Sequence, residues 1–407
     1  MKVMRKFLLI MSYCIVLAGC GSTTGYRITG MIPGMQDGVK VYLEMIDEDS
    51  AEKIDSTIVL GEKFVLESTK SLSCPRMAML IYNLTPDEQN QRKVELRRTV
   101  LFLSDGVELH CTCPVDSLPS CYFSPKIQDH NVLITGSLDV DLYMDYLRQT
   151  TNLRQQRFDA RNDYLDAYKK VETGEITLHE VMEMVRERDK TVKELNDRIL
   201  RFLKTHGNSI VAVDGLIWLL DANPSCFTLK EINQYIEMIA PQLLETPLGK
   251  RLQIAIERAK ACAKGELYKD IELTNLEGKK VKLSEYILPG QCNMLEFWAS
   301  WCAPCRGEIP HLRHIYELCE DGNFNMISIS LDQKETDWKK AVQEENMIWA
   351  QLNDPLGFEG PVRKDYRVNG VPFCLILDKE GRIVCAGVRK VELDVALSDL
   401  LGDKLKI

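Results

Sequence analysis

The chain has 407 residues, of which 45% are hydrophobic and 27% are charged, and its formal net charge at pH 7 is −9. This length predicts two or three domains, while the composition excludes both a disordered chain and a multi-span membrane protein. Because a negatively charged chain has no basic surplus to neutralise a phosphate backbone, we expect no nucleic-acid partner.

The N-terminus has the three-part layout of a signal peptide. Basic residues precede the apolar run FLLIMSYCIVL at 7–17, which is too short to span a hydrocarbon layer about 30 Å thick. The residues LAGC at 17–20 resemble a bacterial lipobox, and this resemblance implies removal of residues 1–19 and lipidation of Cys20. Residues 20–25 would then be a lipidated tether, with an ordinary signal and an incidental cysteine as the alternative.

Residues 26–135 contain short β-rich segments separated by Gly, Asp and Pro, a pattern typical of an antiparallel sandwich or barrel. The expected strands are 26–30, 40–47, 53–60, 63–67, 77–83 and 94–103. Residues 136–265 change to a helical period, with capping boxes that begin at Thr177 and Thr228. The charged run 186–198 predicts a solvated helix face, with a partner-binding helix as the alternative.

Residues 266–407 predict a short hairpin at 271–283 and then the element order β-α-β-α-β-β-α. The expected strands are 293–299, 325–331, 373–378 and 382–388, and the expected helices are 303–319, 336–346 and 391–401. A strand-helix-strand unit followed by an antiparallel strand pair predicts a mixed sheet with helices on both faces. This α/β order resembles the thioredoxin arrangement.

The motif WCAPCR at 301–306 lies where a predicted strand passes into a helix. Free backbone N–H groups and the helix dipole at such a position stabilise a thiolate, so we expect Cys302 to be a nucleophile near neutral pH. Two intervening residues place Cys305 within disulfide reach and further inside, as a resolving thiol. Half of a zinc site is the alternative, but the only other close cysteine pair is the CTC triplet at 111–113, so we expect no metal.

These residues resemble the TlpA/ResA-like branch of the thioredoxin superfamily, over about residues 266–407. The resemblance implies that Glu296, six positions before Cys302, is a buried acid that exchanges a proton with Cys305. A Glu296 that faces solvent is the alternative. The resemblance also implies that Glu308 acts near the disulfide, and here an ordinary first-turn helix carboxylate is the alternative.

The GVP triplet at 370–372 stands where this family has a cis-proline packed against the CxxC motif. The resemblance implies a cis bond between Val371 and Pro372, and backbone hydrogen bonds from Val371 to an extended client segment. Together with Trp301, these two residues would form the substrate-binding surface.

The remaining cysteines and histidines carry less information. Four cysteines of the N-terminal region could pair in three ways, and the sequence leaves all three open: Cys74, Cys111, Cys113 and Cys121. His311 and His314 have a spacing found in metal sites, but no acid is in phase with them apart from those of the motif. For these two we expect a solvated or half-buried face.

The order of lipobox, β domain, helical region and TlpA-like domain resembles envelope thiol-disulfide lipoproteins of Bacteroidota. We therefore expect a membrane-anchored thiol-disulfide oxidoreductase, working as a reductase without a cofactor. Its expected partners are disulfide-containing client proteins and an upstream membrane electron donor. Acidic residues that mark surface export in that group do not follow Cys20, so we expect the anchor to face the periplasm.

Two alternatives come from other functional classes. A peroxiredoxin-like thiol peroxidase would reduce hydroperoxides at a single thiol, although its usual Pro-x-x-x-Thr-x-x-Cys loop is replaced here by Ala299-Ser300-Trp301 before Cys302. A non-catalytic lipoprotein would bind a ligand or partner and use the thioredoxin-like domain as a platform. The presence of both Cys302 and Cys305 argues against the second alternative.

Overall fold

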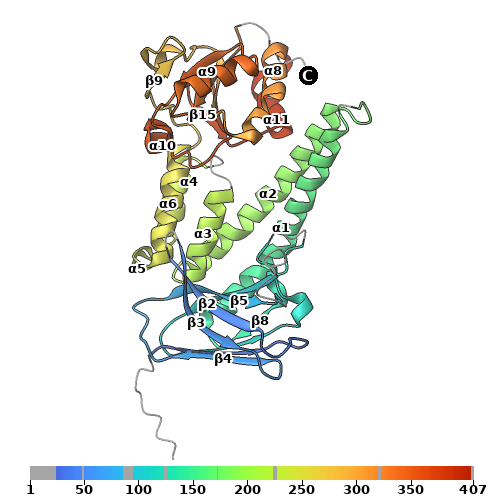
Figure 1. Cartoon of the computed structure of the whole chain (residues 1–407), viewed down its shortest axis with the longest axis vertical. Coiled ribbons are helices and arrows are strands. Elements are labelled where there is room, and N and C mark those ends of the chain that lie inside the picture. The colour runs from blue at the N-terminus through green and yellow to red at the C-terminus, as the bar shows by residue number, and fades with distance from the viewer. Residues whose placement is uncertain are drawn as a thin grey trace, which may run out of the picture.

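The computed structural model describes residues 24–47, 50–85, 95–122, 126–171, 173–222, 227–319 and 322–404. The predicted signal peptide at 1–19 and the predicted lipidation of Cys20 lie outside these residues. In the described part of the chain, no helix is long and apolar enough to cross a membrane. Figure 1 shows a β-rich region at one end, helices in the middle and an α/β domain at the other end.

The β-rich region forms two four-stranded sheets in its described residues, with the orders β4-β1-β7-β8 and β3-β2-β5-β6. The strands are β1 (Tyr26–Met31), β2 (Lys40–Ile46), β3 (Ala51–Ile58), β4 (Lys63–Ser68), β5 (Arg76–Asn83), β6 (Leu96–Leu103), β7 (Val107–Thr112) and β8 (Leu133–Thr135). All six expected strands are present, whereas β7 and β8 lie outside the strands expected from the sequence. Pairing is antiparallel except between β1 and β7, which run parallel.

The middle region is helical, as predicted. Its helices are α1 (Leu138–Lys169), α2 (Leu178–His206), α3 (Ile210–Ala222), α4 (Leu229–Glu237), α5 (Pro241–Leu244) and α6 (Pro247–Ala261). Both predicted capping boxes form, because the Thr177 and Thr228 hydroxyls accept from the N–H groups of Glu180 and Glu231. The long helices α1 and α2 pack side by side as a hairpin. Apolar residues from both sheets and from these helices share one hydrophobic core.

The C-terminal domain is the expected α/β fold. Its elements are β9 (Glu272–Asn275), β10 (Lys280–Lys282), β11 (Cys292–Trp298), α7 (Ala303–Arg306), α8 (Ile309–Leu318), β12 (Phe324–Ser330), α9 (Glu335–Glu344), β13 (Ala350–Asn353), α10 (Pro361–Tyr366), β14 (Phe373–Leu377), β15 (Ile383–Ala386) and α11 (Val391–Leu401). In its described residues the sheet has the order β10-β9-β13-β12-β11-β14-β15. The strand β13 and the helix α10 were not expected from the sequence. The single helix expected at 303–319 is broken at Gly307 into α7 and α8.

Two apolar cores lie on opposite faces of this sheet. Residues of α8, α9 and α11 cover one face, and α10 with the end of α6 covers the other. Side chains of β11 alternate between the two faces, so that Met294 and Trp298 belong to the first core while Leu295 and Phe297 belong to the second. This alternation directs Glu296 to the same face as α8.

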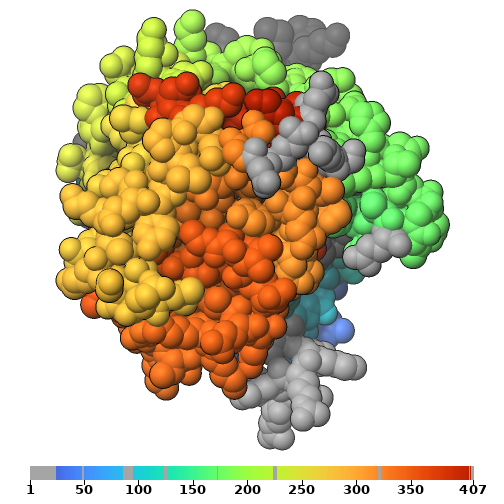
Figure 2. All heavy atoms as spheres, turned by 90° about the horizontal axis from the view of Figure 1, so that it is seen from above, coloured from blue at the N-terminus to red at the C-terminus, as the bar shows by residue number. Residues whose placement is uncertain are grey.

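The tip of the α1–α2 hairpin packs against the C-terminal domain. Val181 and Val185 of α2 join a small apolar cluster with Val391 and Val395 of α11. Figure 2 shows the hairpin, in green, against the side of the orange and red domain. The charged run 186–198 is therefore only partly a solvated face, because two of its arginines form ion pairs with α11.

Candidate active site

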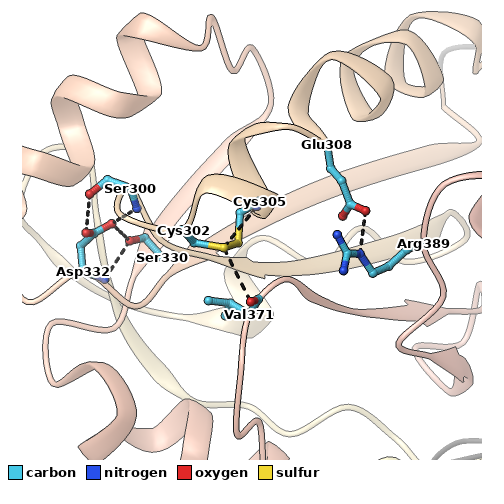
Figure 3. The surroundings of a disulfide bond; sticks show 8 residues. All are labelled: Ser300, Cys302, Cys305, Glu308, Ser330, Asp332, Val371 and Arg389. Atoms are coloured by element: carbon cyan, nitrogen blue, oxygen red, sulfur yellow. Dashed lines mark hydrogen bonds and ion pairs between the residues drawn. A yellow bond between two sulfur atoms is a disulfide. The ribbon is translucent and has the colours of Figure 1, made fainter. Parts of the chain in front are cut away.

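The CxxC motif follows β11, and its two cysteines form a disulfide (Figure 3). Cys302 is the N-cap residue of α7 and is 4% exposed, whereas Cys305 lies within this helix and is fully buried. Trp301, directly before the motif, is 61% exposed. Of the two cysteines, Cys302 is thus the one that an incoming group can reach.

Backbone groups surround the sulfur of Cys302. The N–H of Cys305 donates to Cys302 Sγ over 3.2 Å, and the carbonyl oxygen of Val371 lies 3.6 Å from the same sulfur. The bond between Val371 and Pro372 is cis, as the resemblance implied. Once the disulfide is reduced, an N–H aimed at the sulfur favours the thiolate because it stabilises negative charge.

A buried carboxylate that the sequence did not single out holds the loop before the motif. Asp332 is 2% exposed and accepts hydrogen bonds from the N–H and the hydroxyl of Ser300, over 2.8 and 2.6 Å. It also accepts from the hydroxyl of Ser330 over 2.7 Å (Figure 3). Both Ser300 and Asp332 follow neighbouring parallel strands, whose carboxyl ends meet at one edge of a sheet. The position of both residues just after two expected strands is the feature of the sequence that could have indicated this contact.

Glu296 lies in the middle of β11 and is 4% exposed, so its predicted burial is confirmed and the solvent-facing alternative is wrong. The hydroxyl of Ser328 on β12 donates to Glu296 Oε2 over 2.6 Å, and the indole N–H of Trp349 donates to Ser328 Oγ over 2.8 Å. Burial raises the pKa of Glu296 to about 8, with the Ser328 hydrogen bond opposing the rise and the charge of Glu308 adding to it.

Glu308 lies at the break between α7 and α8 and is 8% exposed. The Nε of Arg389 donates to Glu308 Oε1 over 2.6 Å, and the Glu308 side chain makes no capping hydrogen bond to α8 (Figure 3). It is therefore a buried, ion-paired carboxylate rather than an ordinary first-turn residue. Glu296, Glu308 and Pro372 line one cavity of about 10 Å³, which has room for about one water molecule.

A groove of about 440 Å³ opens beside Trp301, the residue directly before Cys302. The ring of Phe358 forms one wall, with its centroid 6.4 Å from that of Trp301. Leu331 and Lys334, from the segment after β12, contribute another part of the lining. An extended segment of another protein that reaches the disulfide would thus find an aromatic surface beside it.

The four cysteines of the N-terminal region lie away from this chemistry, whereas Cys374 and His311 line the cavity with Glu296. Cys74, Cys111, Cys113 and Cys121 form no disulfide in the described residues, and burial raises the pKa of Cys111 to about 12 and that of Cys113 to about 11. His311 is half-buried, with Nε2 2.8 Å from Asp394 Oδ1. Within the ranges that the structure describes, no group of three or more His, Cys, Asp or Glu residues is arranged to hold a metal ion.

A CxxC disulfide at the start of a helix, a cis-proline beside it and a mixed sheet covered on both faces define a thioredoxin-like domain. Residues 265–386 match the AhpC/TSA family, and residues 26–143 match DUF4369, a domain of unknown function. The expected resemblance to ResA-like thiol-disulfide oxidoreductases is confirmed for the C-terminal domain.

Two ResA proteins illustrate the similarity. The chain is 28% identical over 112 residues to the thiol-disulfide oxidoreductase ResA of Bacillus thuringiensis subsp. konkukian, and 29% identical over 114 residues to that of Bacillus cereus strain ZK. Each match covers 28% of this chain and 62% of the relative, so the chain spans less than two thirds of the length of these relatives.

Solved structures from Bacteroides are also similar. The C-terminal domain of a putative thiol-disulfide oxidoreductase from Bacteroides thetaiotaomicron is 26% identical, with a TM-score of 0.33, and the match covers 35% of this chain and 97% of that one. The thioredoxin domain of a thiol-disulfide oxidoreductase from Bacteroides vulgatus is 30% identical, with a TM-score of 0.31, over 34% of this chain and 96% of that one.

Proposed function

We propose that this chain is a membrane-anchored thiol-disulfide oxidoreductase that reduces disulfides of envelope client proteins. The observation that carries the proposal is the reachable Cys302–Cys305 disulfide at the start of α7, with an N–H donor on the Cys302 sulfur. The similarity of the C-terminal domain to ResA proteins supports the same chemistry. In this proposal residues 266–407 are the catalytic domain, and residues 26–135 and 136–265 are a β domain and a helical region that carry it.

The reaction begins with the reduced dithiol. The Cys302 thiolate attacks one sulfur of a client disulfide, and the second client sulfur leaves as a thiolate that takes up a proton. Cys305 then gives its proton to Glu296 and attacks Cys302 Sγ, which releases the first client sulfur. Two electrons pass from the dithiol to the client, and the disulfide between Cys302 and Cys305 is the product. An upstream membrane donor returns two electrons and two protons to restore the dithiol.

The remaining site residues have supporting roles in this proposal. Glu296 suits proton exchange because its pKa of about 8 lies close to neutral pH. Glu308, which shares the cavity with it, sets the charge that Glu296 faces. Val371 and Pro372 present backbone groups to an extended client segment, and Trp301 with Phe358 offers an aromatic surface to the neighbouring side chains.

The proposed activity is tested with the mature full-length chain and a disulfide reporter. We expect it to reduce insulin with dithiothreitol as electron donor, and we expect Cys302→Ser to abolish this reduction. Cys262→Ser is the matched control, because burial raises the pKa of that thiol to about 11 and keeps it protonated. Full activity in Cys302→Ser would remove the proposal, and reduction of hydroperoxides in place of insulin would favour the peroxidase alternative.

The proposed anchor is tested separately, at Cys20. Two or three acyl chains on Cys20 would hold the protein on the membrane, facing the periplasm, whereas one chain gives only marginal binding. We expect Cys20→Ser to move the protein from the membrane fraction to the soluble fraction of the envelope. Unchanged fractionation together with unchanged lipid labelling would contradict the lipoprotein assignment.

A further inference from the structure

The α1–α2 hairpin holds one glutamate at the start of α11. Arg188 Nη1 lies 2.7 Å from Glu392 Oε1, and the hydroxyl of Tyr164 donates to the same oxygen over 2.6 Å. The side chains of Arg188 and Glu392 are only 12% and 22% exposed. An apolar cluster surrounds this contact, with Tyr164, Val181, Met182 and Val185 from the hairpin and Val391 and Val395 from α11, all buried. The first turn of α11 is therefore fixed by the hairpin.

The segment that leads into α11 and the first turn of this helix make two contacts near the active site. Arg389, three residues before Glu392, pairs with Glu308 beside the disulfide. Asp394, two residues after Glu392, pairs with His311 of α8. Lys390 has a φ of 50°, a positive value that a residue with a side chain keeps only where its surroundings impose it. The backbone that follows Arg389 is thus held between the hairpin and α8.

We propose that the α1–α2 hairpin positions Arg389 against Glu308, acting through Glu392, and so sets the charge that faces Glu296 in the active-site cavity. Arg188 and Tyr164 are positioning residues for the proton-transfer step, although they do not contact the disulfide. The inference rests on the proposed function for its catalytic meaning, and it gives the helical region a part in the chemistry. The link between the hairpin and the cavity can be tested without any client protein.

The sign of the effect follows from the charges around Glu296. The titratable and charged groups that line the cavity with it come from α8, β14 and the segment before α11: Glu308, His311, Cys374, Arg389 and Lys390, with Asp394 facing His311. When Arg389 moves away, the negative charge of Glu308 is less compensated. Because like charges disfavour ionisation, the pKa of Glu296 rises further above its value of about 8.

The test follows the protonation of Glu296 directly in the oxidised full-length chain. The infrared carbonyl stretch of the protonated carboxyl, assigned by its loss in Glu296→Gln, is recorded against pH. We expect Arg389→Met to raise the midpoint by about one pH unit, and Arg188→Met to raise it by about half a unit. Glu392→Gln removes the charge at the other end of the same contact, so we expect the same direction and a similar size.

Arg186→Gln is the matched control. It removes one positive charge from the same helix and breaks the more exposed pair with Asp399, at the far end of α11. We expect no shift in this variant, and we expect Arg188→Met to add nothing when Arg389 is already Met, since the two would act in series.

Three results would overturn the inference: an unshifted midpoint in both Arg188→Met and Glu392→Gln, an equal shift in Arg186→Gln, or an undiminished Arg188→Met shift in the Arg389→Met background. None of these depends on insulin reduction, whose absence in the unmodified chain would instead count against the proposed function.

Discussion

The two halves of the molecule differ in what they bury. In the described residues of the β-rich and helical regions, the buried polar side chains are hydroxyls: Thr99, Thr150, Thr151, Ser209 and Thr246. In the described residues of the C-terminal domain, buried carboxylates occur as well: Glu296, Glu308, Asp332, Asp354 and Asp394. Asp214 of α3 is the exception in the helical region: it keeps some exposed surface, but burial raises its pKa, and the cations Arg154 and Arg251 oppose the rise. Because a buried carboxylate costs free energy, the C-terminal domain, with five of them among its described residues, gives up more stability in this way than the other half.

The buried carboxylates also differ among themselves. Asp332 accepts three hydrogen bonds, Asp354 accepts from two backbone N–H groups, Asp394 has His311 and Glu308 has Arg389. In the described structure, Glu296 receives one hydrogen bond, from the neutral hydroxyl of Ser328. Glu296 combines burial with a single hydrogen bond and no cationic partner, so its pKa rises to about 8. In our proposal the C-terminal domain buries Glu296 for proton transfer, whereas its other buried acids are held by hydrogen bonds or ion pairs.

The largest effect that would sharpen this contrast is expected at Cys305. In Cys305→Ser the attack by Cys302 proceeds but resolution does not, so mixed disulfides with client proteins should accumulate. Non-reducing gels of envelope extracts should show adducts that dithiothreitol removes, and their mass spectra would name the clients. Cys262→Ser, at a buried thiol near the end of α6, should give none. The absence of adducts in Cys305→Ser would break the assignment of the resolving thiol.

A core substitution in the β-rich region should lower the stability of the chain and leave its insulin reduction nearly unchanged. Leu80 of β5 is fully buried in the core that the two sheets share with the helices. We expect Leu80→Ala to lower the free energy of unfolding by about 2–5 kcal/mol, because it removes buried methyl groups and leaves a cavity. Thermal denaturation followed by circular dichroism measures the loss. Insulin reduction at a temperature where the variant is folded should stay within about twofold of the unmodified chain. A loss of reduction as large as that of an active-site variant would break the separation of the two halves.

The next effect concerns the rate of resolution at Glu296. Near pH 7 we expect Glu296→Gln to slow the attack of Cys305 by about 10²-fold, because a positioned proton acceptor is lost. The carboxylate fraction grows as pH rises towards a pKa of about 8, so the rate of the unmodified chain should rise with pH up to that range. The variant should lack this rise and recover only at higher pH, where a thiol ionises unaided. Stopped-flow measurement of the attack and resolution steps across pH separates the two.

Glu237→Gln, at an exposed carboxylate of α4, is the control for this experiment and should leave both steps unchanged. If the pH profile of resolution is the same in Glu296→Gln and in the unmodified chain, Glu296 is a packing residue. The proton acceptor would then be Glu308 or water.

The contrast also explains what the sequence could predict. The strand that became β11 and the CxxC motif were readable because an apolar run and short-range spacing define them, whereas the cis-proline was implied only by the family resemblance. The strand β13, with the sequence AQLN, was not, because Gln351 and Asn353 are buried polar residues and its apolar signal is weak. The hydrogen bonds from Ser300 to Asp332 and from Arg188 to Glu392 join residues that are far apart in the chain. Their partners emerge only after folding, since a carboxylate or an arginine in a sequence looks the same whether water or another side chain satisfies it.

The smallest expected effect lies one step outward from Glu296, at Trp349. Its indole N–H donates to Ser328 Oγ, and this polarises the hydroxyl that in turn donates to Glu296. Chains of hydrogen bonds strengthen each member by roughly 10–30%, so Trp349→Phe should weaken the donation to Glu296 while keeping an aromatic ring in the core. That donation lowers the pKa of Glu296, so its loss should raise the midpoint, by about 0.3 pH unit in Trp349→Phe and by about one unit in Ser328→Ala. Resolution at pH 7 should slow more in Ser328→Ala than in Trp349→Phe. An unmoved midpoint in Ser328→Ala would mean that burial alone sets the pKa of Glu296, and a larger shift in Trp349→Phe than in Ser328→Ala would mean that the ring, rather than its N–H, shapes the cavity.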